Sequence, residues 1–211
     1  MGRQRSKADL PTKTCPVQPV EVTSRQQWRD WLVTHHQQTD SIWLVTYKKQ
    51  AGDGPDGPVS DHRYLPYDAI VEEALCFGWI DSLPRRLDAD RTMLLLSPRR
   101  PKSAWSKLNK TRVAHLMDQG LITPAGLAKI EQAKADGSWT FLDDVEALII
   151  PTNLAAALAQ NPTAANYFDA FSPSAKKGIL QWIKSAKQVA TRQKRIAKTV
   201  ECAAQNLKAN G

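Results

Sequence analysis

The sequence predicts an α+β fold that is predominantly helical, with a small antiparallel sheet and helices in the N-terminal half and only helices in the C-terminal half. Segments rich in β-branched and aromatic residues occur before about residue 100. Helix start signals recur after that point. The 211 residues, 42% hydrophobic and 24% charged, suffice to bury a core without disulfides or metals.

The N-terminal half opens with a polar stretch containing several prolines, so residues 1–22 are predicted to be a loose tail. Ser24 is a suitable N-cap for a helix that runs to about residue 36 and carries an apolar stripe. The β-branched and aromatic residues of 41–49 predict a strand. Glycine, proline and aspartate crowd residues 50–66, which are therefore predicted to form a loop.

Three further elements complete the predicted sheet region. Pro66 opens a helix that Gly78 ends, because glycine readily adopts the left-handed conformation found at helix C-termini. Residues 79–88 and 91–99 are predicted to be two antiparallel strands joined by a turn. They form a small sheet with the strand at 41–49.

The rest of the chain carries helix start signals. Ser106 caps one helix, and Thr123 followed by proline begins the next. Later starts are marked by Pro151, Pro162 and Pro173. Residues 174 to about 207 place apolar and basic residues on opposite faces of one helix, or of two if Thr191 caps a second.

These patterns predict three parts of the chain. A tail (1–22) precedes an α+β domain (23–145), and a helical C-terminal domain (146–211) packs on that domain.

Positive charge is concentrated in two stretches that lack acidic residues. The chain has 29 Lys and Arg against 21 Asp and Glu, a formal net charge of +8. Residues 91–117 hold seven basic residues and residues 170–200 hold eight, so the remainder is acidic. Such partition predicts a positive surface for a phosphate, a carboxylate or an acidic protein surface, with a solvated helix face as the alternative.

Several classes of protein are disfavoured. Three widely spaced cysteines fit neither a disulfide framework nor a zinc ribbon, and no secretory signal or apolar run of about 18 residues is present. The sequence therefore favours a cytoplasmic protein without a transmembrane segment. It lacks a phosphate loop, a dinucleotide fingerprint and a nucleophile elbow, so no cofactor is expected. The loop residues Asp53, Asp56, Asp61 and His62 match no calcium-loop spacing.

The segment SPRRPKSAWSKLN (97–109) is the first candidate site, because it joins the end of a strand to the start of a helix. A helix N-terminus offers free N–H groups, and adjacent arginines add planar donors, so the segment is either an anion cradle or a rigid connector. Its candidate ligand-binding residues are Ser97, Arg99, Arg100, Ser103, Trp105 and Asn109.

Two further motifs supply candidate residues. FGWIDS (77–82) places Trp79 beside Asp81, a lone carboxylate that suits a structural partner for a nearby arginine and, secondarily, a general base. TRQKR (191–195) presents Arg192 and Arg195 on a basic helix face. Cys76 is predicted to be a buried, inert thiol.

Four motifs occur in order: FGWIDS (77–82), SPRRPKSAWSKLNK (97–110), GLITPAG (120–126) and SPSAKKGILQWIKSAKQVATRQKRI (172–196). Together they resemble the bacterial YdeI/OmpD-associated family, also called bacteriocin-protection proteins, from about residue 24 to the end. The resemblance implies protection against bacteriocins or antimicrobial peptides and association with an outer-membrane porin. It also implies a periplasmic location, from which the missing signal peptide departs, and it supplies no catalytic residue.

Three functions follow as hypotheses. The first is a protective protein that binds an anionic partner through both basic stretches. The second is a nucleic-acid-binding protein. The third is an enzyme acting on a phosphorylated or carboxylated small molecule in a cleft formed by Trp79, Asp81, Arg99 and Trp105. The sequence names no reaction and favours binding over catalysis.

Overall fold

The computed structural model describes residues 17–49 and 63–209, and these residues form nine helices and one four-stranded sheet. The chain divides into two compact units. The first extends to Arg99 and includes Ile122–Gly126, and the second comprises Arg100–Leu121 and the residues from Leu127 onward. The predicted α+β class is thereby confirmed. The four loop residues weighed above as a cation site lie outside the described residues.

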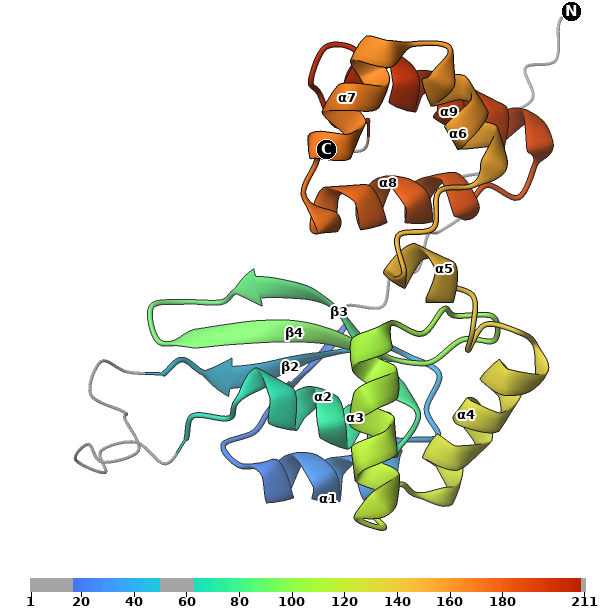
Figure 1. Ribbon diagram of the computed structural model, residues 1–211. Coiled ribbons are helices and arrows are strands. Elements are labelled where there is room, and N and C mark those ends of the chain that lie inside the picture. Colours follow the sequence, from blue (N-terminus) through green and yellow to red (C-terminus); the bar gives the residue numbers. More distant parts are fainter. Residues whose placement is uncertain (1–16, 50–62, 210–211) are drawn as a thin grey trace, which may run out of the picture. The chain divides into compact units, whose positions relative to one another are not determined.

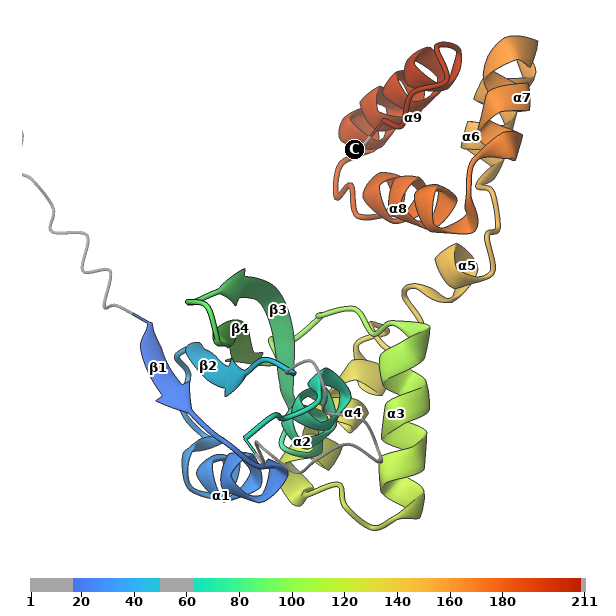
Figure 2. The same cartoon turned by 90° about the vertical axis from the view of Figure 1, so that its left-hand side faces the viewer.

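The first unit is a sheet with helices on one face (Figures 1 and 2). Its elements are β1 (Gln18–Glu21), α1 (Arg25–His35), β2 (Ile42–Tyr47), α2 (Tyr67–Cys76), β3 (Trp79–Arg86) and β4 (Arg91–Pro98). The strand order is β1-β2-β4-β3. The β2–β4 and β3–β4 pairs are antiparallel, as predicted, whereas β1 pairs with β2 in parallel and makes the sheet mixed.

The predicted tail (1–22) extends too far, because residues 18–21 form strand β1. The strand sequence QPVE has no alternation of apolar and polar residues that would indicate a strand, and Val20 is its one buried residue. The backbone pairs residue by residue with β2, and Val22 N–H donates to Val45 O over 3.1 Å. Long-range pairing therefore creates this strand.

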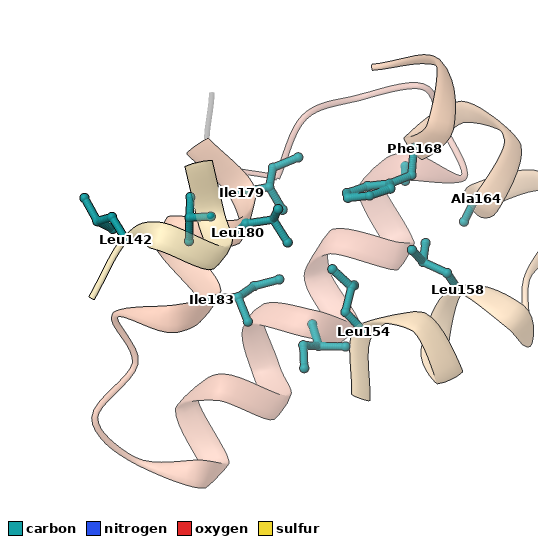
Figure 3. Close-up of a cluster of buried hydrophobic side chains, with 11 residues drawn as sticks. Leu142, Leu154, Leu158, Ala164, Phe168, Ile179, Leu180 and Ile183 are labelled. Atoms are coloured by element: carbon teal, nitrogen blue, oxygen red, sulfur yellow. The ribbon is translucent and has the colours of Figure 1, made fainter. Parts of the chain in front are cut away.

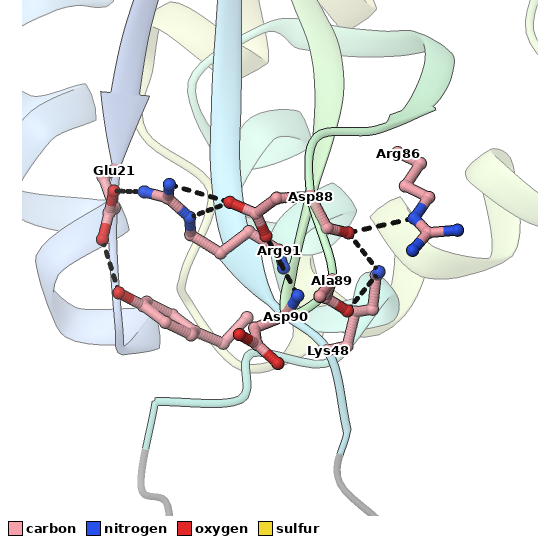
Figure 4. A network of polar contacts seen from close by, with 8 residues as sticks. Glu21, Lys48, Arg86, Asp88, Ala89, Asp90 and Arg91 are labelled. Atoms are coloured by element: carbon pink, nitrogen blue, oxygen red, sulfur yellow. Dashed lines mark hydrogen bonds and ion pairs between the residues drawn. The ribbon is translucent and has the colours of Figure 1, made fainter.

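A polar network fixes one end of the sheet (Figure 4). The Asp88 carboxylate accepts hydrogen bonds from the Arg91 backbone N–H at 2.7 Å and from Arg91 Nε at 2.8 Å. Arg91 Nη1 also reaches Glu21 on β1 at 2.8 Å, and Lys48 Nζ donates to the Asp88 and Ala89 carbonyls at 2.7 Å. The network thus holds the β3–β4 turn and ties β1 to it.

The helix boundaries follow the predicted capping signals. Ser24 Oγ accepts from Gln27 N–H over 3.2 Å at the start of α1, and Ser106 Oγ accepts from Asn109 N–H over 3.2 Å at the start of the next helix. Gly78 adopts φ 76° directly after α2. These capping predictions are confirmed. They could be made from the sequence because each cap depends on neighbouring residues.

The second unit is entirely helical. It contains α3 (Lys107–Asp118), most of α4 (Pro124–Ala135), α5 (Asp143–Glu146), α6 (Thr152–Ala159), α7 (Pro162–Ala170), α8 (Pro173–Lys184) and α9 (Val189–Ala203). Residues from α5 to α9 share one apolar cluster, in which Phe168, Ile179 and Ile183 are fully buried (Figure 3). No helix in the described part of the chain has the length and apolar character needed to span a membrane.

The final basic stretch forms two helices, which resolves the alternatives that the sequence left open. The break lies between Lys184 and Val189, and the N-cap of α9 is Gln188 rather than Thr191. Both helices are amphipathic, and they bury Leu180 and Ile196 in the shared cluster.

The compact units divide after Arg99, whereas the sequence places the boundary between residues 145 and 146. Contacts distant in sequence explain why residues 100–121 belong with later helices. Trp105 N–H donates to Ser138 O over 3.3 Å, and its ring centre lies 5.0 Å from that of Trp139.

Candidate anion-binding site

The FGWIDS residues are engaged inside the first unit. Trp79 is completely buried, and its Nε1 donates to His36 O over 3.0 Å. Asp81 accepts a 2.6 Å hydrogen bond from the hydroxyl of Tyr67. A buried tryptophan whose N–H is paired acts as a packing residue.

Ser97 and Arg99 lie at the end of β4 in the same unit. The hydroxyls of Ser97 and Ser41 are 2.8 Å apart and share a hydrogen bond. Arg99 is 4% exposed; burial lowers the pKa of its guanidinium to about 10, and the negative charge of Asp81 partly opposes this shift. The electrostatic coupling agrees with the interpretation of Asp81 as a structural partner of a nearby arginine.

The segment from Arg100 to Ser106 lies in the second unit and carries the contacts of a fixed connector. Trp105 is 1% exposed, while Arg100 is exposed and its carbonyl accepts from Ser103 N–H over 3.2 Å. The Asn109 side chain accepts from Arg112 Nη1 over 3.0 Å. Anion binding by this segment stays a prediction.

Helix α5 supplies the acids that both basic stretches lack. On the side of α3, Lys110 Nζ pairs with Asp143, and the backbone N–H of Lys107 donates to Glu146 over 3.2 Å. Hydrogen bonding to Lys177 Nζ, 2.6 Å away on α8, is the main cause that lowers the pKa of Glu146.

The same helix also engages the end of α8. Burial alone would raise the pKa of Asp144, but the hydrogen bond from Lys184 Nζ helps to lower it below the ordinary value. Part of the positive charge read from the sequence is thus neutralised inside the fold. The acids are visible in the sequence as the run DDVE (143–146), but nothing in the sequence indicates that they lie beside these lysines.

Arg195 on α9 is committed to the fold as well. Its Nη1 donates to the Trp182 carbonyl and, over 2.9 Å, to Ser185 Oγ. Its guanidinium also lies 5.1 Å from the centre of the Trp182 ring. Arg195 therefore satisfies carbonyl and hydroxyl groups at the end of α8 and links the two helices.

Arg192, one turn earlier on α9, has a different environment. Its Nε atom is buried and has no hydrogen-bond partner. The side chain lines a cavity of about 270 Å³ between α6 and α9, together with Asn153, Ala157 and Ile196. A half-buried guanidinium beside an open cavity can receive the oxygen atoms of an anion.

The sequence also missed a cavity of about 260 Å³ in the first unit. Its lining includes three tyrosines, Tyr47, Tyr64 and Tyr67, beside Thr46 and Lys48. These residues come from β2 and the residue after it and from the segment that leads into and begins α2, which are separated in sequence, so no local motif marks them.

Cys76 lies at the end of α2 and is buried. Burial, with a contribution from the charge of Glu73, raises the pKa of the Cys76 thiol to about 11, which agrees with an inert cysteine. Among the described residues, no group of three or more histidine, cysteine or acidic side chains could hold a metal ion.

Two family models match the chain. Residues 20–129, more than half of its length, match a family described as a domain of unknown function (DUF8412). Residues 147–206 match the family described as Bacteriocin-protection, YdeI or OmpD-Associated, and this range contains Arg192 and its cavity. The predicted domain boundary falls between the two ranges. No curated protein and no solved structure matches the chain.

Proposed function

Because this chain belongs to the DUF8412 family and carries a bacteriocin-protection, YdeI or OmpD-associated domain at residues 147–206, we propose that it is a protective protein that binds an anionic partner through helix α9. The match of residues 147–206 to the bacteriocin-protection family supports the protective role. The charge distribution on α9 supports the anionic partner.

The observation that carries the proposal is a set of uncommitted cations at the start of α9. Among the described residues, the side chains of Lys187, Arg192 and Lys194 make no hydrogen bond or ion pair. They lie within eight residues of one another, and no acidic residue occurs in the first turn of the helix. Their charges add to the positive end of the helix dipole, so the local potential attracts anions.

The other basic positions are weaker candidates because the fold already uses several of them. Lys110, Lys177 and Lys184 pair with the acids of α5, and Arg195 is bonded to the end of α8. An anion that bound these groups would have to displace an existing partner. We therefore restrict the proposed anion-binding surface from the two basic stretches to Lys187 and the first two turns of α9.

The sign of the charge also limits how protection works. A basic surface repels a cationic peptide, so direct capture of such a peptide by α9 is disfavoured. An acidic protein surface or another polyanion fits the helix. Protection would then act through that partner.

The proposal is tested by fluorescence anisotropy with a labelled acidic peptide, poly-glutamate, at about 50 mM salt. We expect the triple variant Lys187→Gln, Arg192→Gln, Lys194→Gln to bind at least about tenfold more weakly, because three unpaired cations are removed. The matched control is Arg100→Gln, Lys102→Gln, Lys107→Gln, which removes the same charge from the first basic stretch. Its affinity should fall by less than about threefold.

Equal losses in the two triple variants would show that only net charge matters, and the assignment to α9 would be abandoned. A parallel titration with labelled DNA and RNA separates the nucleic-acid hypothesis from the acidic-partner hypothesis. Tighter binding of either nucleic acid would favour the nucleic-acid hypothesis instead. The slope of log affinity against log salt concentration should then be steep, and the α9 triple variant should reduce it by about three.

A further inference from the structure

We infer that the cavity between α6 and α9 binds a small carboxylate that carries a short aliphatic group, with Arg192 pairing to the carboxylate. This inference rests on the proposed function, since it assigns specific chemistry to one point of the α9 surface. It goes further by naming the ligand class and the group that anchors it.

The cavity is a lined depression between two helices. Helix α6 contributes Asn153 and Ala157, one turn apart, and α9 contributes residues on one face from Val189 to Ala197. Its volume of about 270 Å³ lies just below the range typical of small-molecule pockets. It therefore suits a ligand of few atoms.

Arg192 is the anchor. Its Nε exposes less than 1 Å² and has no hydrogen-bond partner, although a nitrogen removed from water normally finds one. The missing acceptor can be supplied by a ligand. A carboxylate offers two coplanar oxygens that match the planar donors of a guanidinium, so it can bind Nε and a terminal nitrogen together.

The charge of the lining favours a singly charged ligand. Arg192 is the one cationic side chain among the residues that line this cavity in the described structure. Helix α9 begins at the rim with Val189, and its N-cap Gln188 makes no side-chain capping bond, so the positive end of the helix adds a fractional charge. The charge of one arginine and the fractional charge of a helix end match the single negative charge of a carboxylate more closely than the double negative charge of a phosphate.

Apart from Arg192 and the polar side chains of Asn153 and Gln193, the cavity lining is apolar. Ala157, Ala197 and Ile196 line the cavity, and Val189 at its rim is 74% exposed. A short aliphatic chain would cover these groups while the carboxylate meets Arg192. Free fatty acids of short chain and the C-terminal carboxylate of a peptide with an apolar last residue share this chemistry.

The test is an NMR titration of the full chain with hexanoate, butanoate, hexanamide and hexyl phosphate, following backbone amides and the Arg192 Nε signal. Hexanoate should bind saturably, shift signals of α6 and α9, and bind more tightly than butanoate by roughly fourfold per methylene. Hexanamide, which has the same shape without the charge, should bind at least about tenfold more weakly. Equal binding of hexanamide, or tighter binding of hexyl phosphate, would overturn the inference.

Variants separate the anchor from the walls. Arg192→Gln should abolish hexanoate binding, and Arg192→Lys should weaken it because the planar fork is lost. Ala157→Leu fills the cavity and should remove hexanoate binding while poly-glutamate binding is retained, and its thermal midpoint shows that the variant is folded. Unchanged hexanoate binding in Arg192→Gln would contradict the assignment.

Two further arms identify the source and separate the two proposals. A tripeptide ending in leucine should bind with a free C-terminus and lose affinity when amidated, if the natural ligand is a chain end; hexanoate binding without peptide binding assigns a free small carboxylate. If poly-glutamate binds and no carboxylate does, this inference fails and the proposed function stands. If hexanoate binds and poly-glutamate does not, the proposed function fails and the assignment of the cavity to a small carboxylate stands.

Discussion

Helix α8 and the part of α9 up to residue 200 come from one acid-free stretch of sequence, yet they use their positive charge differently. Lys177 and Lys184 on α8 form ion pairs with α5, whereas Lys187 and Lys194, at and beyond the break between the helices, make no ion pair in the described structure. The difference lies in what packs nearby and not in local composition. A run of basic residues is therefore a candidate binding surface only after tertiary partners are known.

The first prediction separates the two helices by packing and carries the largest effect. Ile183→Ala on α8 should lower the free energy of unfolding by about 3 kcal/mol, because Ile183 is completely buried in the helical core. Val189→Ala at the rim of α9 should change it by less than about 0.5 kcal/mol, since that side chain is 74% exposed. Urea denaturation measures both. Similar losses would mean that the start of α9 is packed as tightly as α8.

The second prediction tests the use of charge. Lys177→Met with Lys184→Met keeps the alkyl stems but removes both pairs to α5, so the free energy of unfolding should fall by roughly 1 kcal/mol, with the gap closing at high salt. Lys187→Met with Lys194→Met should leave stability unchanged and weaken poly-glutamate binding. If the Lys187 and Lys194 substitutions destabilise the protein as much as the Lys177 and Lys184 substitutions, the two helices do not differ in how they use their charge.

The third prediction concerns pH and is the smallest. The pKa values of Asp144 and Glu146 are lowered in the fold, so these carboxylates hold protons less tightly when folded than when unfolded. Their stabilising contribution is therefore complete above the ordinary values of 3.8 and 4.5 and is lost as pH falls through the lowered values. Stability should drop below about pH 4, by less than about 1 kcal/mol in total.

Denaturation curves at pH 7 and pH 3 measure this loss, and Asp144→Asn with Glu146→Gln should reduce the part of the pH dependence that these two groups cause. If the double variant shows the full wild-type pH dependence, the carboxylates of α5 do not stabilise the helical unit in the way the structure indicates.

Local signals in the sequence predicted most helix boundaries. Ser24, Ser106 and Gly78 act within a few residues of themselves, so their effect can be read without knowing the fold. Strand β1 and helix α5 escaped prediction for the opposite reason. Each is short, and each depends on partners distant in sequence: β2 for the strand, and lysines of α3 and α8 for the helix.

The candidate site was predicted in composition but not in arrangement. Arg192 and Arg195 look equivalent in the sequence, since both lie on the basic face of one helix. In the structure Arg195 is bonded to the end of α8, while Arg192 borders a cavity that needs α6 to exist. The cavity was not predictable because its two walls are more than 30 residues apart in the chain.

By itself the sequence determined the α+β class, the capped helices, the family resemblance and the placement of positive charge in two stretches, because each of these depends on residue type and near neighbours. Only the tertiary structure decided which charges remain available. Ion pairing and desolvation act over a few ångströms in space, so the acids of α5 neutralise lysines on two other helices while Arg192 is left beside an open cavity.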